Sequence, residues 1–377
     1  MTRIITTLAA MIKAFTVFTL LVGIIRCTDK PLKVFPGREW EYDTEALLPR
    51  TINEAEAFLN TIETTGLMVV QGGKVVYEYG DVAEVSYVAS VRKSILSMLF
   101  GAHVTSGEIH LDATLKELEM SEIGGLLPIE LNATVLDLIT ARSGVYHAAS
   151  NSGDLLEYAP ARGSKIPGTY WLYNNWDFNA AGSVFEVTTG KNIYDAMHDE
   201  LAIPLLMQDF DRLRQKKDEL PEVSQNPAYT TWLSTRDMAR LGLLMLRNGM
   251  WEDRQIIPVD WVEESTRITI PFSNMNPDFM RKGPFGYGYM WWVWDGQFAS
   301  GPYKGGYTAS GAHGQWITIL PAIDMVVVHK TFWSSSSGIK FNVKRQDYYR
   351  LLDLLTGNKP ATQEELLHWG DIDNESK

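Results

Sequence analysis

The chain has 377 residues, of which 45% are apolar and 21% are charged, a composition typical of a globular protein with a large core. With 34 Lys and Arg residues against 46 Asp and Glu, its net charge is −12, which disfavours nucleic acid as a partner. Cys27 is the only cysteine, and the seven histidines show no metal-ligand spacing. The sequence therefore predicts no disulfide framework, no metal site and no cofactor.

The N-terminus predicts export. Arg3 and Lys13 precede an uncharged, mostly apolar stretch, residues 14–25, in the order and length of a secretory signal. A membrane span would have to begin near residue 4 and include Lys13, and a lysine near the bilayer centre costs about 2.5–3.5 kcal/mol. We expect residues 1–27 to be a signal peptide for a periplasmic or extracellular protein. Membrane association through residues 4–25, as an uncleaved anchor, is the alternative.

The remaining chain alternates between strand and helix patterns. Strands are expected at 66–70 and 74–80, joined by a glycine turn, and again at 287–295, 314–321 and 325–331. Helices are expected at 53–63, 91–103, 134–144, 177–190, 235–249 and 346–357. This order predicts an α/β domain made from residues 28–104 and 285–377, interrupted by a mainly helical insertion, residues 105–284.

Ser90 and Lys93 form an S-x-x-K motif at the start of the helix expected at 91–103. Positions i and i+3 share one helix face, so the lysine can reach the serine hydroxyl and accept its proton if burial lowers its pKa. The motif alone is weak evidence, since Ser337 and Lys340 also fit it. Without further support, Ser90 would be interpreted as a helix cap.

The order of later motifs favours the catalytic interpretation of Ser90. Tyr173 and Asn175 form the only Y-x-N in the chain, directly before a helical segment. A glycine-rich stretch, "GGYTASGAHGQWITILP", then leads into a strand. Ser337 has neither element after it.

In these motifs the chain resembles the serine β-lactamase and penicillin-binding-protein family, in the class C-related branch with esterases and 6-aminohexanoate-dimer hydrolases. The resemblance implies an antiparallel sheet flanked by helices, with a helical insertion. It also implies that Ser90 is the nucleophile, that Lys93 and Tyr173 form the general-base pair, and that the backbone N–H groups of Ser90 and Ala312 form the oxyanion hole. The family's third motif falls on residues 309–311, where Ala309 replaces the usual lysine or histidine. This departure disfavours efficient β-lactamase activity.

The remaining site residues are expected to bind substrate. Asn175 would hydrogen-bond Lys93 or an acyl amide, although it could instead cap the next helix. One ring among Trp291, Trp292 and Trp294 could line an apolar cleft. The full set of substrate-binding candidates is Asn175, Ser310, Gly311, His313, Tyr170 and Trp176.

Together these features predict an exported serine hydrolase that cleaves small esters or amides through an acyl-enzyme on Ser90. A D-alanyl-D-alanine carboxypeptidase or weak β-lactamase is the second interpretation. A non-catalytic binding module of the same fold is the third. The acyl and leaving groups and the oligomeric state stay open.

Overall fold

The computed structural model describes residues 34–333, 338 and 341–358. The expected signal peptide or anchor, including residues 4–25 and Cys27, lies outside the described residues, as do Ser337 and Lys340. Within the described part, no helix is both long and apolar enough to cross a membrane.

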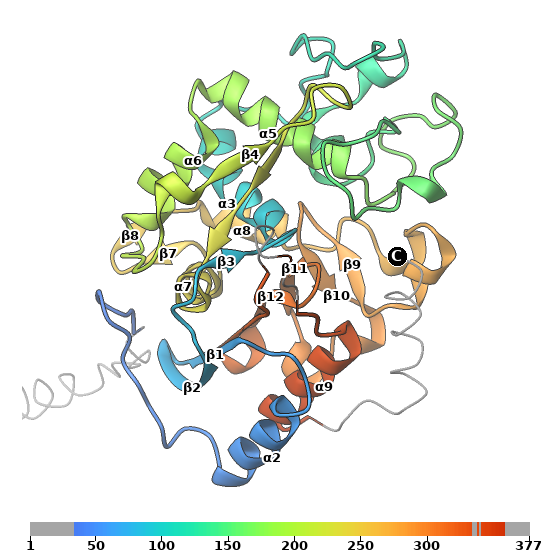
Figure 1. Ribbon diagram of the computed structural model, residues 1–377. Coiled ribbons are helices and arrows are strands. Elements are labelled where there is room, and N and C mark those ends of the chain that lie inside the picture. Colours follow the sequence, from blue (N-terminus) through green and yellow to red (C-terminus); the bar gives the residue numbers. More distant parts are fainter. Residues whose placement is uncertain (1–33, 334–337, 339–340, 359–377) are drawn as a thin grey trace, which may run out of the picture. The chain divides into compact units, whose positions relative to one another are not determined.

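The centre of the fold is a seven-stranded antiparallel sheet, whose strands come from both the N-terminal and the C-terminal parts of the described chain (Figure 1). Its strand order is β2-β1-β13-β12-β11-β10-β9. The strands are β1 (Gly66–Gln71), β2 (Lys74–Gly80), β9 (Phe285–Tyr287), β10 (Trp292–Trp294), β11 (Tyr307–Gly311), β12 (Gln315–Leu320) and β13 (Met325–Lys330). The expected hairpin at 66–80 is confirmed, and the turn between β1 and β2 has two glycines at positive φ.

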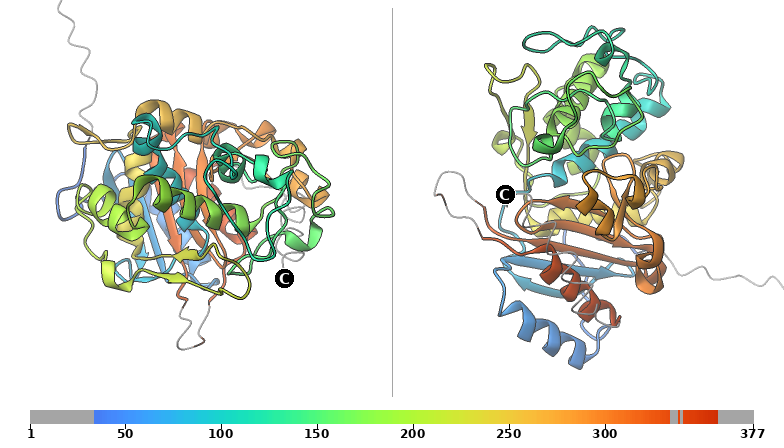
Figure 2. Two further views of the ribbon diagram at one scale, coloured as in Figure 1. Left: turned by 90° about the horizontal axis from the view of Figure 1, so that it is seen from above. Right: turned by 90° about the vertical axis from the view of Figure 1, so that its right-hand side faces the viewer.

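Helices cover both faces of this sheet, which explains why β12 and β13 are buried along their whole length rather than in alternation (Figure 2). On one face lies α7 (Thr235–Leu246), whose Gly242 allows close contact with Ile317 and Val326. On the other face, Tyr348 of α9 (Arg345–Thr356) stacks on Trp316 with ring centroids 4.1 Å apart.

The helix α3 (Val91–Thr105) is buried almost all round, because β11, β12, α5 and α8 pack against it. The remaining α-helices are α2 (Pro49–Leu59), α4 (Val135–Ile139), α5 (Asn175–Thr189), α6 (Ile193–Ala196) and α8 (Val259–Ser265). Gly101 of α3 lies so close to Trp261 of α8 that an added Cβ would be 2.6 Å from the indole ring. The expected helix at 91–103 is therefore confirmed and sits in the middle of the fold.

The chain between α3 and β9 carries helices and the short strands β4 to β8, which with β3, just before α3, form three two-stranded ribbons. They pair β3 (Ser86–Tyr87) with β6 (Trp232–Leu233), β4 (Lys216–Asp218) with β5 (Ala228–Thr230), and β7 (Met250–Trp251) with β8 (Arg254–Gln255). Two contacts cross the expected boundaries of the insertion, since α7 packs on the main sheet and β3 pairs with β6. The boundaries at residues 104 and 284 stay a prediction.

One strand expectation needs correction. Residues 287–295 were expected as a single strand, but they form the end of β9, a turn and β10. Met290 adopts φ of 63° in this turn, and the Gly288 N–H donates to the Trp291 carbonyl. The aromatic residues of this segment favoured a strand, and the segment has no proline or asparagine to indicate a turn.

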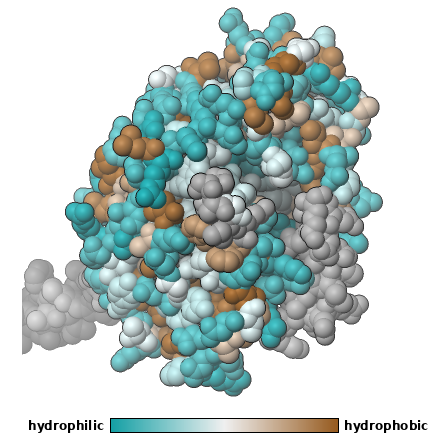
Figure 3. Space-filling model, viewed as in Figure 1, coloured by the Kyte–Doolittle hydropathy of each residue, from teal (hydrophilic) through white to brown (hydrophobic). Residues whose placement is uncertain are grey.

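On the face shown in Figure 3, hydrophilic residues predominate and apolar residues are scattered in small groups. This agrees with a chain whose apolar side chains are mostly gathered in one core.

Candidate active site

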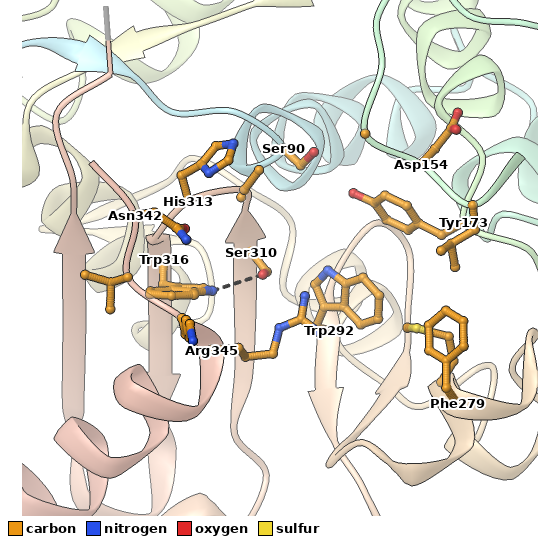
Figure 4. A pocket seen from close by; sticks show the side chains of 17 residues that line it. Ser90, Asp154, Tyr173, Phe279, Trp292, Ser310, His313, Trp316, Asn342 and Arg345 are labelled. Carbon is orange, nitrogen blue, oxygen red and sulfur yellow. Dashed lines mark hydrogen bonds between the residues drawn. The ribbon is translucent and has the colours of Figure 1, made fainter. Parts of the chain in front are cut away.

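Ser90 stands at the N-terminus of α3 and lines a cavity of about 360 Å³, here called the Ser90 pocket. Although Ser90 occupies the capping position, it has helical backbone angles and its side chain makes no capping hydrogen bond. The hydroxyl is thus left available to the cavity. In Figure 4 it points toward the hydroxyl of Tyr173 on the opposite wall.

Lys93 lies one helical turn after Ser90 and is 1% exposed. Its Nζ donates to the Tyr173 hydroxyl at 2.6 Å and to Asn175 Oδ1 at 2.6 Å. Neither partner is a carboxylate. The amine also lies over the rings of Tyr173 and Phe178, 4.0 and 4.4 Å from their centroids.

Burial holds the pKa of Lys93 well below its usual value, and the neighbouring positive charge of Arg92 lowers it further. Asp154 acts in the opposite direction. The Arg92 guanidinium is itself buried between neutral partners: it donates to Asn179 Oδ1 at 2.9 Å and lies over the Tyr229 ring at 4.2 Å. No nearby acid therefore neutralises Arg92 through these contacts.

Burial raises the pKa of Tyr173 to about 12, while a hydrogen bond with Ser90 and the charge of Arg92 lower it. At neutral pH the phenol is protonated, and the amine of Lys93 is the group poised to accept a proton. Since Tyr173 contacts Lys93 on one side and Ser90 on the other, it can relay a proton from the serine to the lysine.

The end of β11 and the turn after it form the wall next to Ser90. Gly311 fits here because it lacks a Cβ, which would lie 2.6 Å from the Val88 carbonyl oxygen and 3.1 Å from the Ser90 nitrogen. Ser90 and Ala312 line the same cavity, and their backbone N–H groups have no hydrogen-bond partner among the described residues. Two such donors beside a nucleophile are what an oxyanion requires.

The other two predicted residues of this wall have structural contacts of their own. Ser310 lines the pocket, and its Oγ accepts a hydrogen bond from Trp316 Nε1 at 3.0 Å (Figure 4). His313 also lines it, in a turn at φ of 66°, and its ring makes a T-shaped contact with that of Trp333, with ring centroids 4.9 Å apart.

Asn175 positions Lys93 rather than lining the cavity. It is fully buried, its Oδ1 accepts from Lys93, and its Nδ2 donates to the Ser152 carbonyl at 2.9 Å. The cap of α5 is the preceding residue, Asn174, whose side chain accepts from the Trp176 N–H. Of the alternatives for Asn175, the structure shows the hydrogen bond to Lys93.

Tyr170 and Trp176 were expected to be cleft walls, but neither lines the Ser90 pocket. Trp176 is fully buried, with its indole N–H donating to Glu122 at 2.6 Å, so its ring is committed to the core. Tyr170 is half-buried, with Lys165 Nζ 4.7 Å from its ring centroid. Of the three tryptophans at 291–294, Trp292 lines the pocket.

Sequence reasoning missed several wall residues that come from loops and a distant helix start. Phe279 stands with Trp292 and Tyr173 on one side of Ser90, and Asn342 stands on the other, with the Arg345 side chain reaching toward Trp292 (Figure 4). Met280 also lines the pocket. These residues carry no motif, and only folding brings them together. The Ser90 pocket thus combines an aromatic wall with polar lining residues and one cationic side chain that lies near Trp292.

Groups of three or more side chains able to hold a metal ion are absent from the described part of the chain.

The chain belongs to the beta-lactamase family, since the family model of that description matches residues 53–331. An uncharacterised protein of Alkalihalophilus pseudofirmus is 23% identical over 275 residues, 68% of this chain and 76% of that protein. The family assignment agrees with the motifs and with the antiparallel sheet described above.

Solved structures show the same fold. A candidate 6-aminohexanoate-dimer hydrolase from Bacillus anthracis matches with a TM-score of 0.56 at 18% identity, covering 85% of this chain and 81% of that one. EstCE1, described as a hydrolase with promiscuous acyltransferase activity, matches with a TM-score of 0.57 at 15% identity, covering 82% and 98%. The expected β-lactamase/transpeptidase-like fold is therefore confirmed.

Proposed function

We propose that the protein is a serine hydrolase that cleaves small esters or amides through an acyl-enzyme on Ser90. One arrangement carries this proposal: a serine hydroxyl that makes no capping hydrogen bond faces a phenol, and the phenol is hydrogen-bonded to a buried lysine amine that has no carboxylate among its hydrogen-bond partners. Membership of the beta-lactamase family supports a hydrolase of this fold.

Acylation begins when Ser90 Oγ attacks the substrate carbonyl. The serine proton passes to Tyr173 as the phenol proton passes to Lys93, which becomes an ammonium group. The carbonyl oxygen becomes an oxyanion held by the backbone N–H groups of Ser90 and Ala312. When the tetrahedral intermediate collapses, the bond to the leaving group breaks and Tyr173 supplies the proton to it, with Lys93 restoring the phenol.

Deacylation reverses the roles. Water attacks the Ser90 ester and gives its proton to the Tyr173–Lys93 pair, the same N–H groups hold the second oxyanion, and the proton returns to Ser90 Oγ as the acid leaves. The lowered pKa of Lys93 matters in both halves, because only the neutral amine can accept a proton.

A fluorophosphonate probe and a p-nitrophenyl butyrate assay test this function together. The full chain should gain one adduct on Ser90 by peptide mass spectrometry and should hydrolyse the ester, whereas Ser90→Ala should do neither while melting within a few degrees of the parent. An unlabelled Ser90 in a folded protein would contradict the proposal and favour the non-catalytic binding module.

The alternative activity is hydrolysis of β-lactams or D-alanyl-D-alanine peptides. One observation supports it: Arg345 lines the pocket and could form an ion pair with a substrate carboxylate. Ala309 opposes it: this residue is fully buried in β11 and carries no charge. We expect p-nitrophenyl butyrate to be turned over faster than nitrocefin. Faster nitrocefin turnover would reverse this order.

Export stays a proposal that rests on residues 1–27 of the sequence. Fractionation of cells that express the full chain, with the probe-labelled protein as marker, tests it. Labelled protein confined to the cytosol would contradict export, and labelled protein in the membrane fraction would favour the anchor.

A further inference from the structure

A second cavity, of about 820 Å³, adjoins the Ser90 pocket and is more than twice its size. We call it the aromatic chamber because Tyr87, Trp232 and Trp333 are among its lining residues. The centroid of the Tyr87 ring lies 5.5 Å from that of Trp232 and 4.7 Å from that of Trp333, so the three rings form one cluster. None of these rings has a role in the proton relay.

The two cavities meet along both walls. On one wall Asp154 lines both, with Gly153 on the side of the Ser90 pocket and Ser152 on the side of the chamber. On the other wall His313 of the Ser90 pocket contacts Trp333 of the chamber at 4.9 Å, edge to face. The cavities are thus neighbours at Asp154, and a molecule that occupies both would pass this residue.

The loop at this junction is firmly held. Asp154 accepts the backbone N–H of Asn175 at 2.9 Å and that of Leu156 at 3.2 Å, and the Ser152 carbonyl accepts from Asn175 Nδ2. The residue that orients Lys93 thus also fixes the wall shared by the two cavities. Asn175 thus holds both Lys93 and the wall at Asp154 in place.

The lining favours an apolar, ring-bearing ligand. Leu220 and Val223 join the aromatic cluster, and flat rings gain from edge and face contacts with Tyr and Trp. The charged residues of β4 do not set a strong preference, because Lys216 and Asp218 carry opposite charges and Lys217 is paired with Glu186. Uncharged polar side chains, Ser150, Asn151, Ser152 and Thr230, also line the chamber, so the ring cluster with Leu220 and Val223 is the part that would hold an apolar, ring-bearing group.

We propose that the aromatic chamber binds the acyl part of the substrate and selects esters or amides whose acyl chain ends in an aromatic ring. This rests on the proposed function of Ser90. The leaving group must lie at Tyr173, which gives it a proton, and the pocket walls beside Tyr173 are Phe279, Met280 and Trp292. The chamber does not include Tyr173, so the acyl side is the part that reaches it.

Two p-nitrophenyl esters separate the chamber from the catalytic site. The acetate ester fills only the Ser90 pocket, whereas the 4-phenylbutyrate ester also reaches the chamber. Because burial of an aromatic ring is worth about ten- to a hundredfold in affinity, we expect kcat/KM for phenylbutyrate to exceed that for acetate by about this factor, after correction for their rates of alkaline hydrolysis.

Two variants test the chamber by different means. Trp232→Ala removes part of the ring cluster, and Ala148→Trp fills the chamber from an exposed lining position, where folding should be unaffected. Both should lower the phenylbutyrate-to-acetate ratio about tenfold or more and leave acetate hydrolysis unchanged. Leu213→Ala, which is 92% exposed and outside the lining, is the control and should keep the parental ratio.

The outcomes separate this inference from the function beneath it. If the parent hydrolyses acetate without favouring phenylbutyrate, or if folded Trp232→Ala and Ala148→Trp both keep the parental ratio, the chamber does not bind the acyl group. If the parent hydrolyses neither ester and takes no fluorophosphonate, the function proposed for Ser90 is wrong and the chamber's role falls with it.

Discussion

At the scale of single residues, the site depends on a lysine whose pKa is held low by its surroundings. Lys93 is buried, bonded to two neutral groups and close to a second cation, Arg92. Of these features, burial and the charge of Arg92 disfavour the ammonium form. An ordinary buried lysine would be stabilised by a carboxylate, so this arrangement is suited to proton transfer rather than to stability.

The first prediction concerns the relay itself. Lys93→Ala and Tyr173→Phe should each lower kcat for p-nitrophenyl butyrate by about 10²–10⁴, the range for lost general-base catalysis, with little change in KM. The double variant should lose scarcely more than either single variant, because both act on one proton path. Steady-state kinetics measure this, and losses that multiply in the double variant would show two independent roles.

The second prediction concerns pH. Activity requires neutral Lys93, so kcat/KM should fall as pH drops through the lowered pKa of this group. Arg92→Gln removes a positive charge that lowers this pKa, so the pKa should rise and the acid limb should move to higher pH. If Arg92 had only a structural role, Arg92→Gln would lower the maximal kcat/KM and leave the acid limb of the pH profile at the parental pH. That result would contradict the proposed effect of Arg92 on the pKa of Lys93.

The third prediction concerns stability. Since the pKa of Lys93 is lowered in the folded protein, the unfolded chain binds more protons between that pKa and about 10.4, and stability rises with pH across this window. Lys93→Met should therefore raise the melting temperature by a few degrees at neutral pH, with a smaller gain near pH 10, and should abolish activity.

Lys330 provides a matched control for the stability experiment. Burial lowers its pKa to about 7, and its amine donates to the carbonyl oxygens of Glu84 and Leu233, away from the Ser90 pocket. Lys330→Met should keep parental turnover. If it inactivates the protein as fully as Lys93→Met does, loss of activity would reflect a damaged core rather than a lost base.

At the scale of secondary-structure elements, the site is the meeting point of α3 and β11. The N-terminus of α3 presents Ser90, and β11 can approach it only because residue 311 is glycine. The helix N-terminus adds partial positive charge where the oxyanion forms. The two donors of the proposed oxyanion hole, Ser90 and Ala312, thus lie at the ends of two elements that are far apart in sequence.

The fourth prediction tests this contact. In Gly311→Ala the new Cβ would lie 2.6 Å from the Val88 carbonyl oxygen, so β11 and the start of α3 must separate. We expect kcat to fall by about 10²–10³, the cost of losing one oxyanion donor. Gly37→Ala is the matched control, since no atom lies within 4 Å of its added Cβ. If Gly311→Ala keeps the parental kcat, the backbone N–H of Ala312 does not serve as an oxyanion donor.

The elements themselves were largely predictable. The strands β1, β2, β12 and β13 and the helices α3, α5, α7 and α9 follow from apolar period and glycine stops. The residues of the proposed relay were predicted from motif order, because the family resemblance supplies a pairing that spacing alone does not, and their hydrogen bond is present in the structure. The prediction failed at the turn between β9 and β10. There the Met290 carbonyl accepts a hydrogen bond from Ser94 Oγ of α3, a contact between segments far apart in sequence.

The walls of the site could not be predicted in the same way. Trp176 is a large aromatic residue of the kind that lines clefts, yet its indole N–H donates to Glu122 in the core. Phe279, Asp154 and Arg345 reach the Ser90 pocket from loops and from the start of α9. Local sequence carries no record of which loops meet, so a pocket wall made by loops appears only in the folded chain.

At the scale of the whole molecule, strands from both ends of the described chain form one sheet, and the chain between them supplies the other half of the site. The sheet side gives β11 and Arg345, whereas the middle of the chain gives Tyr173, Asn175 and Asp154. Ser90 lies at the start of the helix between them. This division lets the middle region vary its loops, and thus its substrate, without disturbing the sheet.

The rate of fluorophosphonate labelling of Ser90 tests the relay most directly, because phosphonylation needs the serine proton to be removed and needs no knowledge of the substrate. In the parent the rate should rise with pH and level off above the lowered pKa of Lys93. In Lys93→Ala and Tyr173→Phe labelling should be slower by at least tenfold at neutral pH. If both variants label at the parental rate and with the parental pH dependence, the proton of Ser90 does not pass through Tyr173 to Lys93.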